Sequence, residues 1–166
     1  YTVYRGPNIL PFAGAIRLML PNAKFIFVDR DPVEAAWSTF RVNYQAHPWS
    51  FDFNEIAEWF AAYKATRETW RERIGSESLD VSYESLVADP QRETKRLLKF
   101  IGLSPDPMCD RFYETARLSP VESVRRLRSP IDASSLAPSR AFGAALDPLR
   151  QALELRGVSG AGRVVH

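Results

Sequence analysis

The feature that most constrains the fold is an apolar run, residues 25–28, that leads directly into Asp29-Arg30-Asp31-Pro32. An uninterrupted run of β-favouring residues is typical of a strand in a parallel sheet that is covered on both faces. Asp31 suits a helix N-cap, and Pro32 suits the first helical position. The sequence therefore predicts a buried strand followed by a helix over residues 32–43.

The flanking segments extend this alternation of helices and strands. Apolar residues at helical spacing predict a helix over residues 9–20, with Asn8 as its N-cap. A second short strand is predicted at residues 79–82. This order is typical of an α/β fold with a parallel-sheet core, in which ligands bind beyond the carboxyl ends of the strands. Arg30 lies at such an end and is a candidate anion-binding residue; the alternative is an ion pair with Asp29 or Asp31.

The remaining chain is predicted to be rich in helix. Residues 53–74 form a long amphipathic pattern that Gly75 ends, and an Asp89-Pro90 start with a Gly102 stop predicts another helix. The other expected segments are an aromatic loop at 44–52, a short helix at 105–116, a long loop at 119–148, a helix at 147–156 and a flexible tail at 157–166.

Composition excludes several kinds of site. The 166 residues include one cysteine, Cys109, and two histidines, which leaves no disulfide within the chain, no cysteine-based zinc site and no histidine cluster. Cys109 is expected to be a small residue of a helical core. The 22 basic and 20 acidic residues nearly cancel, so bulk charge gives no case for nucleic-acid binding. No run approaches the roughly 18 apolar residues of a membrane span, and a cytoplasmic protein is expected.

Two strings in this order resemble sulfotransferases. They are KFIFVDRDPVEAAWSTF at 24–40 and VSYESLVADPQRETKRLLKFIGL at 81–103. The likeness is greatest to the bacterial and tyrosylprotein-type branch, and it runs from about residue 4 to about residue 150. The resemblance implies a fold akin to nucleotide kinases and a sulfuryl donor, 3′-phosphoadenosine 5′-phosphosulfate (PAPS), with its product adenosine 3′,5′-bisphosphate (PAP) as a second ligand.

The resemblance also implies a set of cofactor-binding residues. Arg30 and Ser38, eight positions apart, match positions that bind the 3′-phosphate, and Tyr83 matches a contact to adenine and ribose. The matches in the late loop are Ser123, Arg128 and Arg140. The alternatives are a solvated helix residue for Ser38, a core tyrosine for Tyr83, and solvated loop charges for the two arginines.

Other parts of the family pattern have no match. No Gly/Ser/Thr-rich loop for the 5′-phosphosulfate precedes Asn8, and the usual catalytic base has no matching position. Arg5 aligns with the family's early lysine and is the one catalytic candidate, for stabilising charge on the transferring group. We therefore expect residues 1–156 to be a partial sulfotransferase-like domain, the later part of a larger one; the alternatives are that the missing loop has been lost or that another chain supplies it.

The expected function is sulfuryl transfer to a hydroxyl or amine of a small-molecule or peptide acceptor. The alternative is a catalytically degenerate module for nucleotide binding or protein interaction, indicated by the missing loop and by Trp49 and Phe51 as exposed aromatic residues. A nucleotide-kinase-like enzyme is less favoured because the phosphate loop is missing for it too. A nucleic-acid role depends only on the arginines at 125, 126 and 128. The oligomeric state is left open.

Overall fold

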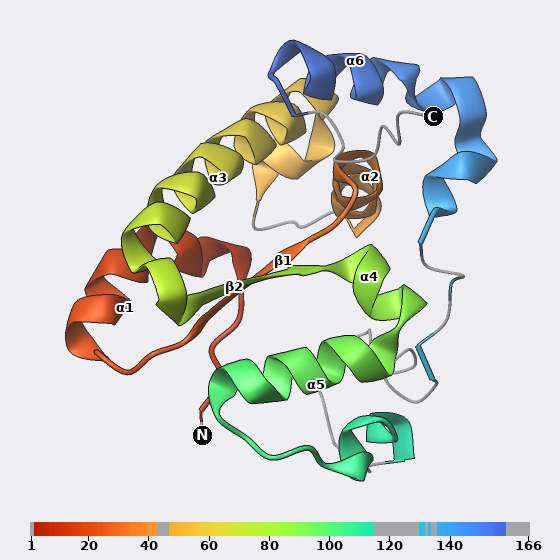
Figure 1. Ribbon diagram of the computed structural model, residues 1–166. Helices are drawn as coiled ribbons and strands as arrows, with labels where there is room; N and C mark the ends of the chain where they lie inside the picture. Colours follow the sequence, from red (N-terminus) through yellow and green to blue (C-terminus); the bar gives the residue numbers. More distant parts are fainter. Residues whose placement is uncertain (1, 43–46, 115–129, 132, 134–135, 159–166) are drawn as a thin grey trace, which may run out of the picture.

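A pair of parallel strands lies at the centre of the computed structural model, which describes residues 2–42, 47–114, 130–131, 133 and 136–158 (Figure 1). Strand β1 (Phe25–Asp29) pairs with β2 (Ser78–Ser82) in a register that runs from Phe25 opposite Ser78 to Asp29 opposite Ser82. Both predicted strands are confirmed. The result is a helix-rich α/β structure with a small parallel sheet.

Helices flank this strand pair without covering all of it. In Figure 1, α3 and α5 run on opposite sides of it, and α6 lies beyond α2 and α3. The α-helices are α1 (Ala13–Met19), α2 (Pro32–Val42), α3 (Phe53–Ile74), α4 (Tyr83–Ala88), α5 (Pro90–Ile101) and α6 (Asp147–Leu155). The 3₁₀ helices are η1 (Pro7–Phe12), η2 (Pro48–Phe51), η3 (Gly75–Glu77), η4 (Pro107–Cys109), η5 (Phe112–Glu114) and η8 (Pro138–Leu146).

The predicted helix ends are confirmed where a capping residue sets them. The Asp89 carboxylate accepts a hydrogen bond from the Arg92 backbone N–H at the start of α5. That helix ends at Gly102 with φ 75°, a left-handed conformation that glycine adopts without a steric penalty. Gly75, with φ 61°, ends α3 in the same region of φ.

The prediction that β1 is covered on both faces is wrong for the described structure. Phe27 is 6% exposed, whereas Ile26 is 40% and Val28 59% exposed. Successive side chains of a strand point to opposite faces. The helices thus cover the Phe27 face of β1 and leave the other face largely open, although the sequence is apolar throughout.

Several predicted helices and loops differ from the structure. The first helix is split into η1 and α1, with Asn8 inside η1 rather than at its cap, and Pro11 supplies no N–H at this point. A short helix was predicted at 105–116; its described part, residues 105–114, forms two 3₁₀ turns instead, and Cys109 in the first of them is half-buried rather than in a core. Helix α4 and the helical segment η8 were not predicted.

The predicted tail at 157–166 begins with packed residues. Val158 is buried, and its backbone N–H donates to the Leu153 carbonyl. The Lys64 ammonium donates to the carbonyl of Gly157 over 3.0 Å. These contacts attach the chain to α3 and α6 as far as Val158.

Two hydrophobic cores fix the positions of the elements. The smaller one packs η1, α1 and the end of α3 on β1 through Leu10, Ala13, Phe27 and Ile74. The larger one joins α2, α3, η8 and α6 through Ala36, Trp37, Ile56, Ala57, Leu146, Leu149, Ala152, Leu153 and Val158. Because α2 takes part in the larger core and follows β1 directly, the turn between them at residues 30–31 is held at both ends.

A buried polar contact joins α2 to η8. The Ser139 hydroxyl donates to one oxygen of the Glu34 carboxylate over 2.5 Å, and the Ser139 backbone N–H donates to the other over 3.1 Å. Both residues are buried. A buried carboxylate needs such donors, since leaving it without them costs free energy.

We expect Ser139→Ala to lower the free energy of unfolding by about 2 kcal/mol, since it removes the shorter of two donors to a buried charged group. Urea unfolding monitored by circular dichroism measures this difference. Ser76→Ala, at an exposed serine of η3, is the control and should change the free energy of unfolding by less than about 0.5 kcal/mol. Equal stability of the two variants would contradict the role given to Ser139.

Candidate functional site

Arg30 and Tyr83 meet at the carboxyl ends of the two strands. The register pairs Asp29 with Ser82, so the next residue of each chain segment lies at the same edge of the sheet. The Arg30 guanidinium carbon lies 5.1 Å from the centre of the Tyr83 ring. A cation over an aromatic face at this distance is attracted by the ring. The structure therefore brings together two sequence-predicted site residues that are far apart in the chain.

The two acidic neighbours of Arg30 have partners of their own. The Asp31 carboxylate accepts hydrogen bonds from the backbone N–H groups of Val33 and Glu34, and so caps α2. The Asp29 carboxylate pairs with Arg67 over 2.6 Å. The sequence left open an ion pair between Arg30 and Asp29 or Asp31. Such a pair would compete with the capping hydrogen bonds of Asp31 and with the ion pair between Asp29 and Arg67.

Glu84 connects the turn after β1 to the turn after β2. Its carboxylate accepts a hydrogen bond from the Asp31 backbone N–H over 2.9 Å and another from the Ser82 hydroxyl over 2.9 Å. Burial acts to raise the pKa of Glu84, but these hydrogen bonds, together with the positive charge of Arg30, outweigh it and lower the pKa. Glu84 thus stays ionised and holds the Arg30 turn against the start of α4.

Arg67 of α3 binds the strand pair from one face. Its guanidinium lies 2.6 Å from Asp29 and 2.7 Å from Asp80, with its side chain only 11% exposed. It also lies over the ring of Phe27, 5.6 Å from the ring centre. Burial raises the pKa of Asp29, and the charge of Arg67 counteracts this. Sequence reasoning missed this group, since no local pattern links Arg67 to either aspartate.

The other predicted site residues lie at different places in the structure, and two of them are outside its described part. Ser38 lies half-buried on α2, one helical turn after Glu34, and Arg140 is exposed on η8 next to Ser139. Because Glu34 binds Ser139, the backbones that carry Ser38 and Arg140 run close together. Arg5 is exposed on the segment before η1. The remaining two candidates, Ser123 and Arg128, lie outside the described residues.

The aromatic segment before α3 packs on that helix. The rings of Trp49 and Trp59 are stacked, with centres 4.6 Å apart and planes 5° apart. Phe51 is 50% exposed, as the sequence suggested. The expectation of two exposed aromatic residues is thus wrong for Trp49, because α3 offers a flat ring on which it stacks.

The fold and this edge of the sheet define an α/β protein with charged and aromatic side chains gathered where parallel strands end. The chain belongs to the sulfotransferase family, whose model matches residues 3–107, more than half of the chain. The matched segment contains Arg5, Arg30, Ser38 and Tyr83. It ends before Arg140.

One relative is an uncharacterized protein of Aquifex aeolicus (strain VF5), 26% identical over 152 residues. The similar region covers 89% of this chain and 20% of that protein, so the chain matches only about a fifth of that relative's length.

Neither a metal-binding cluster nor a membrane-spanning helix occurs in the described part of the chain. Its histidine, cysteine and carboxylate side chains form no group of three that could hold a metal ion. None of the helices described has both the length and the apolar character needed to span a membrane.

Proposed function

We propose that this chain is the part of a PAPS-dependent sulfotransferase that binds the 3′-phosphoadenosine half of the cofactor. The observation that carries this proposal is the Arg30–Tyr83 pair at the carboxyl end of the strands. A guanidinium donates two parallel hydrogen bonds to a phosphate, and an aromatic ring beside it suits a purine nucleoside. Membership of the sulfotransferase family supports the same cofactor.

The residues around Arg30 fit a phosphorylated nucleoside. The turn that carries Arg30 is fixed by the Asp31 cap of α2 and by the hydrogen bond to Glu84, so the guanidinium starts from a defined backbone position. The N-terminal end of α2 adds a positive potential beside it. We propose that Arg30 and Ser38 bind the 3′-phosphate, that Tyr83 contacts the adenosine, and that Ser123, Arg128 and Arg140 approach from the late segment.

The same proposal includes the reaction of the whole protein, which is transfer of a sulfuryl group from PAPS to an acceptor. When bound, PAPS supplies the sulfuryl group that passes to a hydroxyl or amine of the acceptor. The residues of this chain bind and orient the nucleoside end, and Arg5 is proposed to stabilise negative charge near the reacting group. Residues 1–156 then act as one part of a larger catalytic domain.

The position of the phosphate on the nucleoside tests this proposal directly. We expect adenosine 3′-monophosphate to bind about tenfold more tightly than adenosine 5′-monophosphate, since only the former presents its phosphate to Arg30. Isothermal titration calorimetry on the chain measures both affinities. The two ligands have the same atoms and charge, so each serves as the control for the other. Equal affinities, or a preference for the 5′-isomer, would overturn the proposal.

A further inference from the structure

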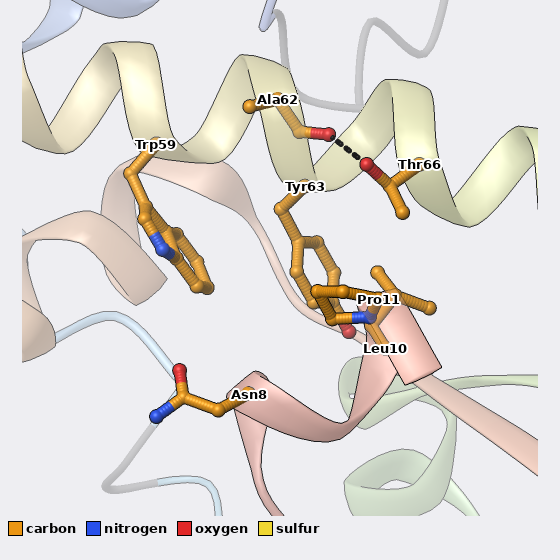
Figure 2. Close-up of a pocket in the computed structure, with 7 residues that line it drawn as sticks. All are labelled: Asn8, Leu10, Pro11, Trp59, Ala62, Tyr63 and Thr66. Carbon is orange, nitrogen blue, oxygen red and sulfur yellow. Dashed lines mark hydrogen bonds between the residues drawn. The ribbon is translucent and has the colours of Figure 1, made fainter. Parts of the chain in front are cut away.

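An uncharged pocket of about 140 Å³ lies between η1 and α3 (Figure 2). The side chains that line it are apolar, aromatic or uncharged polar groups. The Thr66 hydroxyl among them already donates to the Ala62 carbonyl over 2.8 Å, as the dashed line in Figure 2 shows. An anionic nucleotide therefore gains no ion pair in this pocket. Charged side chains do lie at the strand ends, where the contacts of Glu84 reach the segments that carry Arg30 and Tyr83.

The two carboxylate oxygens of Glu84 bind different segments of the chain. Oε1 accepts a hydrogen bond from the Asp31 backbone N–H over 2.9 Å, in the turn between β1 and α2. Oε2 accepts one from the Ser82 hydroxyl over 2.9 Å, at the end of β2. Asp31 and Glu84 are 53 positions apart in the chain, so one carboxylate ties the turn that carries Arg30 to the segment that carries Tyr83.

The same carboxylate also acts on the Arg30 side chain through its charge. The positive charge of Arg30 stabilises ionised Glu84, and the carboxylate attracts the guanidinium in return. The Tyr83 ring attracts the guanidinium as well, with the guanidinium carbon 5.1 Å from the ring centre. Arg30 is thus attracted to two successive residues, Tyr83 and Glu84, before a phosphate binds. A side chain that is already restrained loses less entropy when it binds a ligand.

We propose that Glu84 is a positioning residue that sets the preference of this site for a 3′-phosphate; this rests on the proposed function. The 3′- and 5′-phosphates of a nucleoside lie at different places relative to the base, so distinguishing them requires a fixed separation of Arg30 and Tyr83. Glu84 fixes this separation because it binds the turn that carries Arg30 and directly follows Tyr83 in the chain. A carboxylate repels a phosphate, so Glu84 acts through Arg30 and does not itself bind the ligand.

Isothermal titration calorimetry on the whole chain, with adenosine 3′-monophosphate and adenosine 5′-monophosphate as probes, tests the role of Glu84. We expect Glu84→Ala to reduce the preference for the 3′ isomer from about tenfold to about twofold, because the Arg30 turn loses its link to Tyr83. Glu84→Gln keeps a carbonyl oxygen that accepts from the Asp31 N–H, so it should retain a preference of at least about fivefold. Glu154→Ala is the matched control, since it removes the same charge at an exposed position of α6, and it should keep the wild-type preference.

The ratio of the two affinities separates positioning from folding, because a variant that is partly unfolded binds both isomers more weakly by the same factor. If the wild type itself shows no preference for the 3′ isomer, the proposed function fails, and the role of Glu84 fails with it. If the wild type shows the preference, the cofactor proposal stands and the variants alone decide the role of Glu84. The wild-type ratio in Glu84→Ala would then overturn that role. An equal loss of preference in Glu84→Ala and Glu84→Gln, or a loss in Glu154→Ala, would overturn it as well.

Discussion

Replacing Arg30 with alanine is expected to weaken binding of adenosine 3′-monophosphate about 100-fold, since it removes the two charge-assisted hydrogen bonds that we propose Arg30 donates to the phosphate. Arg30→Lys retains the charge but loses the forked geometry, so its affinity should lie between those of the wild type and Arg30→Ala. Isothermal titration calorimetry on the three proteins gives the order. This substitution tests whether Arg30 contributes to the affinity. The comparison of the 3′ and 5′ isomers tests which phosphate position on the nucleoside the site prefers.

The control for Arg30→Ala is Arg41→Ala. Arg41 is an exposed arginine in the last turn of α2, so its removal changes the net charge equally without touching the strand ends. Arg30→Ala loses the contact to the Tyr83 ring and the attraction to the Glu84 carboxylate, so circular dichroism is used to check that the variant is folded before its affinity is measured. Nucleotide binding by folded Arg30→Ala at the wild-type affinity would contradict the assignment of Arg30.

Replacing Arg67 with methionine is expected to lower the free energy of unfolding by about 2 kcal/mol at neutral pH, because two carboxylates at the strand pair lose their shared cation. The typical cost of breaking a fully buried pair is about 3–5 kcal/mol. Here Asp29 and Asp80 are 47% and 41% exposed, and water screens part of the effect. Urea unfolding of the variant and the wild type measures the difference.

The effect of Arg67→Met depends on pH through Asp29. Burial raises the pKa of Asp29 above its ordinary value of 3.8, so the folded protein holds this proton more tightly than the unfolded chain does. The stability that comes from this difference is present below pH 3.8 and is lost as the pH rises through the folded pKa. Without Arg67 the folded pKa rises further, so the variant loses more stability at neutral pH than in acid. The difference between the two proteins should therefore shrink as the pH falls toward 4.

Arg71→Met is the matched control for this experiment. Arg71 lies one turn further along α3 and is 47% exposed, with Glu68 3.0 Å away and Asp80 3.6 Å away. Exposed pairs of this kind contribute about 0–1 kcal/mol. If Arg71→Met and Arg67→Met destabilise the protein equally, the buried position of Arg67 has no special role.

Local signals in the sequence predicted much of the fold. Asp89 and Gly102 mark the ends of α5 because a capping carboxylate and a left-handed glycine act within one helical turn. Arg30 and Tyr83 each directly follow a predicted strand, so the rule that parallel strands end at one edge of the sheet is consistent with their proximity, but the contact between them was not itself predicted.

Contacts between distant residues could not be predicted in this way. The Glu34–Ser139 contact joins positions 105 residues apart, and neither residue has a neighbouring signal that indicates burial. The exposure of Ile26 and Val28 also contradicts the apolar pattern of β1, because burial depends on which elements pack on each face. Arg67 shows the same limit, since an arginine on a charged helix is usually solvated.

The parallel pairing of β1 and β2 has a consequence for the order of folding events. Phe25 and Ser78 are 53 residues apart, and α2 and α3 lie between them. Closing a loop of this length costs chain entropy before the strand hydrogen bonds repay it, whereas helices form from local contacts. Once the long helix α3 has formed, fewer flexible residues separate the two strands. Arg67 of this helix can then pair with Asp29 of β1 and Asp80 of β2. We therefore expect the sheet edge that carries Arg30 and Tyr83 to be among the last parts of the chain to assemble, since its formation depends on the helix that crosses behind it.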